Sequence, residues 1–178
     1  MVRDATKALD AYDHARALEI TESFFWTFCD DYLELVKERA YDQTDVGQAS
    51  AALSLRIALS TLLRLFAPVV SFASEEAWSW FNEGSVHHAD WPEPTGSSGD
   101  PAVLRAVGEA LVGIRRAKTE AKVSQKTVVA VATVASPHTA ALRLAEGDLK
   151  AVGRIETIVF EDAETTAVTG IELAPQEA

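Results

Sequence analysis

Apolar residues recur at steps of three and four over the first half of the chain, the spacing that predicts amphipathic helices. Neither proline nor glycine occurs before Gly47, so we expect this stretch to be helical, with a break near residues 10–14 and Asp13 as the cap of the second helix. The second helix should be buried on more than one side, because it carries apolar residues on several faces. These residues are Phe24, Phe25, Trp26, Phe28, Tyr32, Leu33 and Leu35.

Two more helices are expected before the next extended segment. The first covers residues 45–67, with Asp45 as its N-cap. Its apolar stripe comprises Leu55, Leu59, Leu62, Leu63 and Phe66. After Pro68, a shorter helix should include residues 72–81 and end near Gly84, and residues 85–94 should be extended or looped.

A linker separates this helical half from a region with a different pattern of predicted helices and strands. Residues 95–101 read TGSSGDP, and Asp100 before Pro101 predicts the start of a helix that reaches about Lys122. Its inward-facing residues should be Val103, Val107, Leu111 and Ile114. Further on, β-rich segments at 127–135, 155–160 and 166–173 predict strands, and residues 137–152 predict helix.

The fold class that these elements predict is mainly α, a helical bundle followed by a small α/β unit. We expect three parts. Residues 1–94 form the bundle, residues 95–126 form a linker plus a basic helix that packs on the bundle, and residues 127–178 form a small mixed α/β subdomain.

The composition narrows the class of protein. With 48% hydrophobic and 24% charged residues among 178, the chain has a globular composition, and its net charge of −11 disfavours indiscriminate coating of nucleic acid. The single cysteine, Cys29, excludes an internal disulfide, and its aromatic neighbours indicate a buried, inert thiol. The longest apolar run, residues 65–73, is too short to span a bilayer, and no signal peptide is evident, so we expect a soluble cytoplasmic protein without a membrane partner.

Recognisable catalytic motifs are absent from the sequence, which has neither a glycine-rich phosphate loop nor a serine nucleophile motif. Asp30, Asp31 and Glu34 could act as paired acids, but their spacing is more typical of a solvated helix face. The adjacent histidines within residues 87–90 would point to opposite sides of an extended segment, which disfavours shared metal ligation. We therefore predict no catalytic residue and no metal site.

Positive charge is concentrated in one short region. Residues 102–126 contain six basic and two acidic residues, whereas the chain as a whole is acidic. On a helix, Arg115, Lys118 and Lys122 step by three and four, so we predict one basic stripe that holds a phosphate backbone at a single place. The alternative is that these cations form salt bridges to the acidic bundle and stabilise the C-terminal end of their helix.

A weaker cluster of cations and aromatic residues lies late in the second helix. Lys37, Arg39 and Tyr41 follow Phe28 and Tyr32 there. Aromatic faces beside cations can stack on unpaired bases and hold them, and this is the function that the cluster indicates. An ordinary helix terminus is the alternative interpretation.

The sequence of residues 25–37, FWTFCDDYLELVK, resembles a segment of bacterial valyl-tRNA synthetases. Three further segments resemble that family in the same order: LLRLFAP with EEAW in residues 62–78, SVH with WP in residues 85–92, and IRRAK in residues 114–118. The resemblance covers residues 4–126 and lies in the C-terminal anticodon-binding domain of these class I aminoacyl-tRNA synthetases. Isoleucyl and leucyl enzymes have a similar helical domain, but residues 25–37 fit the valyl family better.

This resemblance implies a region that binds the tRNA anticodon and positions tRNA(Val) for ATP-dependent aminoacylation by a catalytic domain absent from the chain. The family's ATP-binding signatures, editing domain and terminal coiled coil are not recognised here, so the chain looks like a C-terminal fragment of a valine–tRNA ligase. ATP and magnesium are then expected only for the parent enzyme. The expected partners are tRNA(Val) and the catalytic and editing domains of the parent, and we expect a monomer.

The resemblance also places residues 32–37 on the segment that faces the anticodon loop, with Asp31 where the family has tryptophan. With the cations added, the predicted RNA-binding residues are Tyr32, Leu33, Glu34, Lys37, Arg39, Arg115, Lys118 and Lys122. Three alternatives stay open: the equivalent domain of an isoleucyl- or leucyl-tRNA synthetase, a non-enzymatic helical docking module for a protein partner, and a hydrolase that uses the acids of residues 30–34.

Overall fold

Two units make up the part of the chain that the computed structural model describes, residues 1–96 and 99–174. Unit 1 comprises Met1–Leu33 and residues 40–96, and unit 2 comprises Glu34–Arg39 and residues 99–174. Residues 97–98 of the predicted linker and residues 175–178 of the predicted subdomain lie outside the described residues. The predicted fold class, a helical bundle with a small α/β unit, is confirmed.

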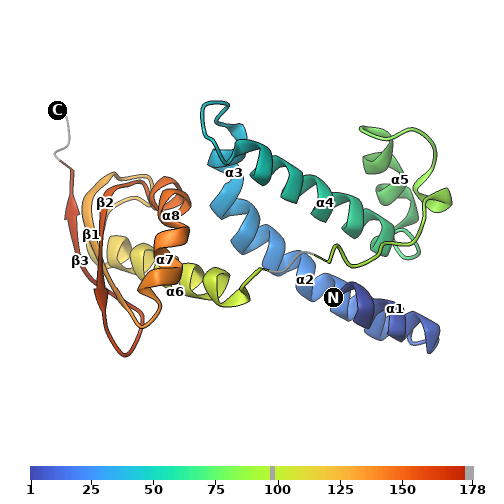
Figure 1. Ribbon diagram of the computed structural model, residues 1–178, viewed down its shortest axis with the longest axis horizontal. Helices are drawn as coiled ribbons and strands as arrows, with labels where there is room; N and C mark the ends of the chain where they lie inside the picture. Colours follow the sequence, from blue (N-terminus) through green and yellow to red (C-terminus); the bar gives the residue numbers. More distant parts are fainter. Residues whose placement is uncertain (97–98, 175–178) are drawn as a thin grey trace. The chain divides into compact units, whose positions relative to one another are not determined.

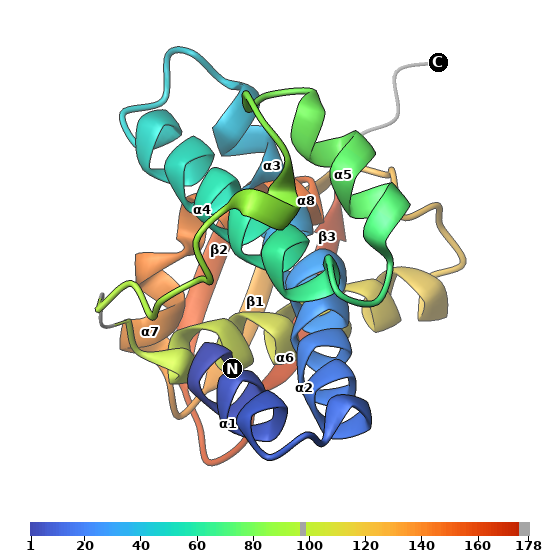
Figure 2. The ribbon, with the colours of Figure 1, turned by 90° about the vertical axis from the view of Figure 1, so that its right-hand side faces the viewer.

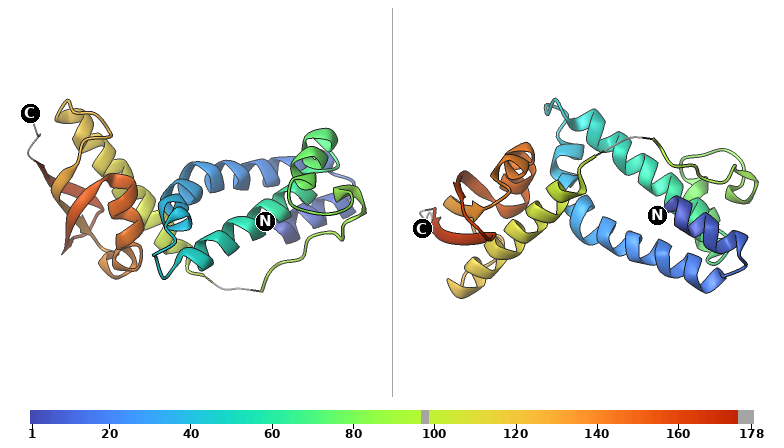
Figure 3. Two further views of the ribbon diagram at one scale, coloured as in Figure 1. Left: turned by 90° about the horizontal axis from the view of Figure 1, so that it is seen from above. Right: turned by 60° about the horizontal axis from the view of Figure 1, so that its bottom comes forward.

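Unit 1 begins with two helices that lie side by side, α1 (Val2–Asp10) and α2 (His14–Thr27) (Figures 1 and 3). The predicted break between them is confirmed, and the Asp13 carboxylate accepts a hydrogen bond of 3.0 Å from the backbone N–H of Arg16. This bond satisfies one of the backbone donors that every helix start leaves without an intrahelical partner.

The segment that follows α2 is wound more loosely than an ordinary helix. Residues Phe28–Leu33 form a π-helix, and α3 (Glu34–Tyr41) continues from it. The sequence predicted one regular helix here. A π-turn takes up an extra residue and changes the direction of the side chains that follow, and such turns are frequent at functional sites.

The remaining helices of unit 1 are α4 (Gln48–Phe66), α5 (Ser71–Ser79) and the 3-10 turn η2 (Val86–His88). A buried cluster of Ala67, Trp78 and Val86 joins them. The Glu75 carboxylate fastens this turn, because it accepts hydrogen bonds from the Ser85 hydroxyl at 2.8 Å and from the Val86 N–H at 2.9 Å.

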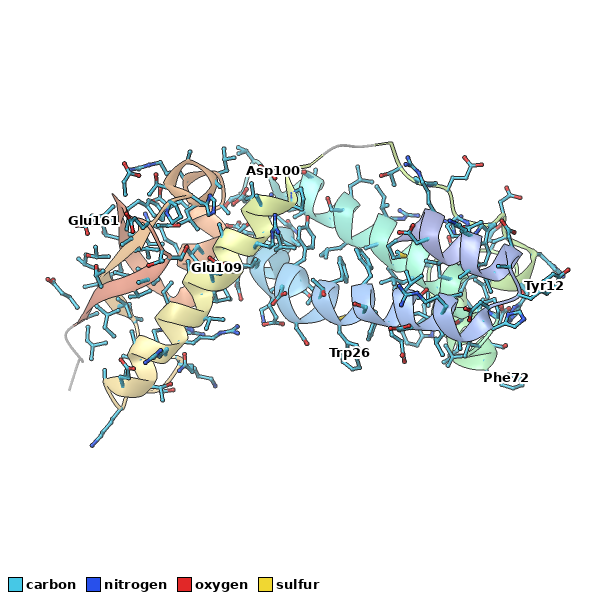
Figure 4. All side chains as sticks on the ribbon, turned by 90° about the horizontal axis from the view of Figure 1, so that it is seen from below. Tyr12, Trp26, Phe72, Asp100, Glu109 and Glu161 are labelled. Atoms are coloured by element: carbon cyan, nitrogen blue, oxygen red, sulfur yellow. The ribbon has the colours of Figure 1, made fainter. Side chains whose placement is uncertain are left out.

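Three sequence predictions for this unit are wrong. Asp45 does not cap α4, because Gly47 occupies the N-cap position and Asp45 instead accepts a hydrogen bond from the Gly47 N–H within the preceding turn. The second helix is not buried on more than one side, because Trp26 is 59% exposed and projects away from the helices of its unit (Figure 4). Leu59 of the predicted α4 stripe is also exposed.

Helix α4 is the one helix among the described residues whose length and apolar composition would allow it to cross a membrane. Core helices of soluble proteins pass the same test of length and composition.

Unit 2 is built on a three-stranded sheet in the order β2-β1-β3. Strand β1 (Val129–Ser136) pairs in parallel with β2 (Ile155–Asp162) and antiparallel with β3 (Ala167–Leu173). Parallel neighbours need a crossover, which α7 (Thr139–Leu144) and α8 (Glu146–Gly153) provide. These two helices and α6 (Pro101–Glu120) lie on the same side of the sheet (Figure 2).

Helix α6 begins where the sequence predicted, since Asp100 accepts a hydrogen bond of 2.8 Å from the Ala102 N–H and Pro101 occupies the first turn. It packs closely on β3 at Gly113, where an added Cβ would lie 2.8 Å from a methyl group of Val168. The sequence predicted that residues 95–126 pack on the bundle, but α6 groups with the sheet in unit 2. Its inward face, including Ile114, is covered by this sheet and its crossover helices.

Candidate nucleic-acid interface

Three aromatic rings form a ladder along the end of α2 and the π-helix in unit 1. Phe24 and Phe28 stack with ring centroids 6.1 Å apart and planes 19° apart, and Phe28 and Tyr32 stack at 5.7 Å and 28°. Residues four apart lie on one face of a helix, which brings the rings into one row. Phe24 is 38% exposed, and Tyr32 and Leu33 are half-buried. A row of this kind can offer an aromatic face to an unpaired base.

A second candidate feature, which we call the unit 2 hollow, has a volume of about 470 Å³. Its polar lining comes from α3, α6, the turn after α6, and the end of α8. The side chains with charges or amides that line it are Glu34, Lys37, Glu38, Arg115, Lys118, Gln125 and Arg154. Apolar residues such as Leu111, Ile114 and Val152 complete the lining. The structure thus brings four residues of the predicted set to one place: Glu34, Lys37, Arg115 and Lys118.

Lys118 does not have the role that the sequence predicted. It is only 1% exposed, and its ammonium group donates hydrogen bonds to the backbone carbonyls of Gln125 at 3.1 Å, Thr127 at 2.8 Å and Gly153 at 2.7 Å. With all three N–H groups used, it is not available to a phosphate. Burial lowers the pKa of Lys118, and the positive charge of Arg154 lowers it further, whereas the three carbonyls favour the charged form.

The error follows from the helical repeat. Lys118 is four residues after Ile114 and seven after Leu111, so it continues the buried apolar stripe of α6 rather than lying opposite to it. Lys122 is not on α6 at all, because the helix ends at Glu120 and Lys122 adopts a left-handed backbone conformation with φ of 56°. The predicted basic stripe therefore does not exist, and Arg115 is its one exposed member on the helix.

Arg39 and Lys37 also have partners within unit 2. The Arg39 guanidinium donates two hydrogen bonds of 2.9 Å to the Asp148 carboxylate of α8. Lys37 donates one of 2.6 Å to Glu34, in a pair that is more exposed. A two-bonded, mostly buried pair is geometrically fixed, so Arg39 joins α3 to α8, whereas the Lys37 pair can open at little cost.

Replacing Asp148 with alanine should lower the stability of unit 2 by about 1–3 kcal/mol, because the largely buried Arg39 guanidinium loses both acceptors. Hydrogen exchange of the β1 backbone amides in the variant measures this loss. The matched control is Glu120→Ala, which removes the partner of the exposed Arg116 and should cost less than about 0.5 kcal/mol. Equal exchange rates in both variants would show that the Arg39–Asp148 pair does not fasten α3.

Arg154 is a candidate that the sequence analysis missed. It follows α8 at a left-handed position with φ of 51°, is exposed, and lines the hollow together with Arg115. The available signal was the Gly153-Arg154 pair between a helical pattern and a strand, which marks a tight turn that presents the second side chain to solvent.

The other residues considered for catalysis or metal binding do not come together in one site within the described residues. Cys29 is half-buried rather than buried, and burial followed by the Asp30 charge raises the pKa of its thiol, which disfavours the reactive thiolate. Asp30 and Asp31 are exposed, and Glu34 is paired with Lys37. Within residues 1–96 and 99–174, no three side chains of His, Cys, Asp or Glu are grouped so that they could hold a metal ion.

A bundle with an aromatic row and a second unit with a cation-lined hollow are features suited to binding folded RNA. The family model that matches this sequence is described as the anticodon-binding domain of tRNA ligase, and it covers residues 1–133. The chain therefore belongs to the family of tRNA ligase anticodon-binding domains.

Similar proteins carry a more specific name. The chain is 57% identical to a valine–tRNA ligase of Leifsonia xyli subsp. xyli over 99% of its own length, 50% identical to one of Thermobifida fusca over 99%, and 42% identical to one of Bifidobacterium longum over 96%. The chain spans about a fifth of the length of these curated relatives. These relatives confirm the resemblance to valyl-tRNA synthetases.

Proposed function

We propose that this chain binds the anticodon arm of a valine tRNA and so positions that tRNA for a ligase that joins valine to it. The observation that carries the proposal is the identity of 57% with a valine–tRNA ligase across nearly the whole chain. That ligase is several times longer, so the ligation itself is assigned to other parts of the parent protein.

The physical properties of the chain support selective rather than general RNA binding. Its net charge of −11 repels phosphate over most of the surface. Cations concentrate at the unit 2 hollow, and the aromatic ladder offers stacking faces for unpaired bases. Binding energy gained at the anticodon, far from the reacting atoms, orients the acceptor end of the tRNA at the distant catalytic site.

The residues that we propose as RNA contacts are Tyr32, Leu33, Glu34, Lys37, Arg115, Lys122 and Arg154. Tyr32 would stack on a base, Glu34 would accept hydrogen bonds from a base edge, and the cations would contact phosphates. The proposal omits Lys118 and Arg39, because their donors are occupied within unit 2.

For the parent enzyme we propose the cofactors ATP and magnesium, bound by its catalytic part. The catalytic and editing domains of the parent are the proposed intramolecular partners, and we propose a cytoplasmic monomer.

A second candidate function, docking on a protein surface, is favoured by one observation. Around the start of α5, Val69, Val70 and Phe72 are exposed, with Phe72 at 93%, and Trp80 near its end is 74% exposed. An apolar surface of this kind is typical of a contact with another domain or protein. Within the proposed function it suits a domain of the parent enzyme.

The test of the proposal is equilibrium binding of the chain to valine tRNA and to the same tRNA with its anticodon exchanged for another. We expect the exchange to weaken binding at least about tenfold, since each well-recognised base is worth about 1–3 kcal/mol. A protein-docking module would bind neither RNA. Equal affinity for both tRNAs would defeat anticodon recognition.

A further inference from the structure

The polar groups that line the unit 2 hollow fall into two chemical classes. The cationic donors are Lys37, Arg115 and Arg154, and no hydrogen bond or ion pair within the described residues occupies the side chains of the two arginines. The anionic or carbonyl acceptors are Glu34, Glu38 and the Gln125 side chain. Donors that suit a phosphate and acceptors that suit a base therefore face the same space.

We propose that the unit 2 hollow receives one unstacked nucleotide of an RNA loop, with its phosphate on Arg115 and Arg154 and its base against Glu34. This inference rests on the proposed function and deepens it, because it names the kind of nucleotide that the chain reads. Three segments of unit 2 that are distant in sequence, residues 34–38, 111–125 and 151–154, contribute to the hollow.

The size and lining of the hollow fit a nucleotide. Its volume of about 470 Å³ is within the range of small-molecule pockets, about 300–1,000 Å³. Leu111, Ile114 and Val152 supply apolar surface against which a flat base can lie. Buried Lys118 holds the shape of the hollow, since its three hydrogen bonds tie α6 to the turn at Gln125 and to Gly153 at the end of α8.

The acceptors indicate which bases the hollow prefers. The Gln125 amide nitrogen already donates to the Arg115 carbonyl at 3.0 Å and to the Thr119 hydroxyl at 3.2 Å, which leaves its oxygen as an acceptor. The ionised Glu34 carboxylate is also an acceptor only. Adenine, cytosine and guanine present exocyclic amino donors, whereas uracil presents one N–H between two carbonyls that would repel the carboxylate. The hollow should therefore discriminate against uracil.

The Glu34–Lys37 pair does not prevent this binding. Both side chains are more than a third exposed, and a pair at this spacing and exposure contributes little to stability because water screens it. An arriving nucleotide can therefore take the carboxylate as its acceptor while Lys37 turns to the phosphate.

The experiment is an NMR titration of the chain with AMP, CMP, UMP and ribose 5-phosphate. We expect shifts that cluster at the backbone amides of Gln125 and Gly153, with AMP and CMP binding about tenfold more tightly than UMP. Glu34→Gln should remove this preference, because an amide can serve uracil as well, and Arg154→Glu should abolish binding of all four. Glu120→Gln and Arg116→Glu, at residues that do not line the hollow, should change nothing.

Two results would overturn the inference: equal affinities for CMP and UMP, or shifts scattered over both units. The amide spectra of the variants report their folding, so a misfolded variant is recognised. In that case the preference of the wild-type chain among the nucleotides still tests the inference. The inference and the proposed function fail differently. If the wild-type chain distinguishes anticodons and the hollow shows no base preference, the nucleotide pocket is refuted alone, whereas loss of anticodon discrimination refutes both.

Discussion

Replacing Lys118 with methionine is expected to lower the free energy of unfolding of unit 2 by about 3 kcal/mol, although the two side chains have similar length. The variant keeps the apolar stem but leaves three carbonyls without their donor, and the Gly153 carbonyl among them is buried. A polar group left unsatisfied in the interior costs about 1–3 kcal/mol, and a weakened turn at Gln125 adds to this.

The chain offers a way to assign this loss to the correct unit. All four tryptophans lie in unit 1, so tryptophan fluorescence follows unit 1, and hydrogen exchange of the β1 amides follows unit 2. Lys118→Met should accelerate β1 exchange by about a hundredfold and leave the fluorescence transition unchanged. Lys126→Met, at an exposed lysine in the turn after α6, is the control and should change neither. Unchanged exchange of the β1 amides in Lys118→Met would refute the idea that the hydrogen bonds of Lys118 stabilise unit 2.

Reversing both Arg115 and Arg154 to glutamate is expected to weaken binding of valine tRNA by more than about tenfold in low salt. Each contact between a cation and a phosphate releases counterions, so losing two contacts should reduce the slope of log affinity against log salt by about 1.4 for a single-stranded loop. The two residues line the same hollow, so their effects should not simply add.

The control for this experiment is the neighbouring residue on the same helix. Arg116→Glu changes the net charge of the chain by the same amount per substitution, but Arg116 pairs with Glu120 and does not line the hollow. Its effect on the affinity should be small and should leave the salt slope nearly unchanged. If Arg116→Glu weakens binding as much as Arg115→Glu, total charge rather than the hollow determines affinity.

Local signals were sufficient for most of the fold. Asp13 and Asp100 each accept the predicted backbone N–H at a helix start, because capping depends on residues within one turn. The strands were also recognisable, since β-branched runs bounded by turn residues are a local property. Which unit α6 joins is a matter of distant contacts, such as Gly113 against Val168, and the apolar pattern of α6 does not specify its partner.

The candidate site was less predictable, and Lys118 shows why. A lysine seven residues after a buried leucine can be an exposed cation or a buried donor, and the outcome depends on carbonyls supplied by residues 125–153. Arg39 presents the same difficulty, because its partner Asp148 is more than a hundred residues away. The resemblance in residues 25–37 identified the family correctly, but only the structure separates structural cations from available ones.

Hydroxyl-radical footprinting of valine tRNA bound to the chain is the sharpest test of the proposal that the chain binds the anticodon arm. We expect protected riboses confined to the anticodon loop and the adjoining stem, and loss of this protection in the Arg115→Glu, Arg154→Glu double variant. Protection spread evenly over the tRNA, or centred on the acceptor arm, would contradict it.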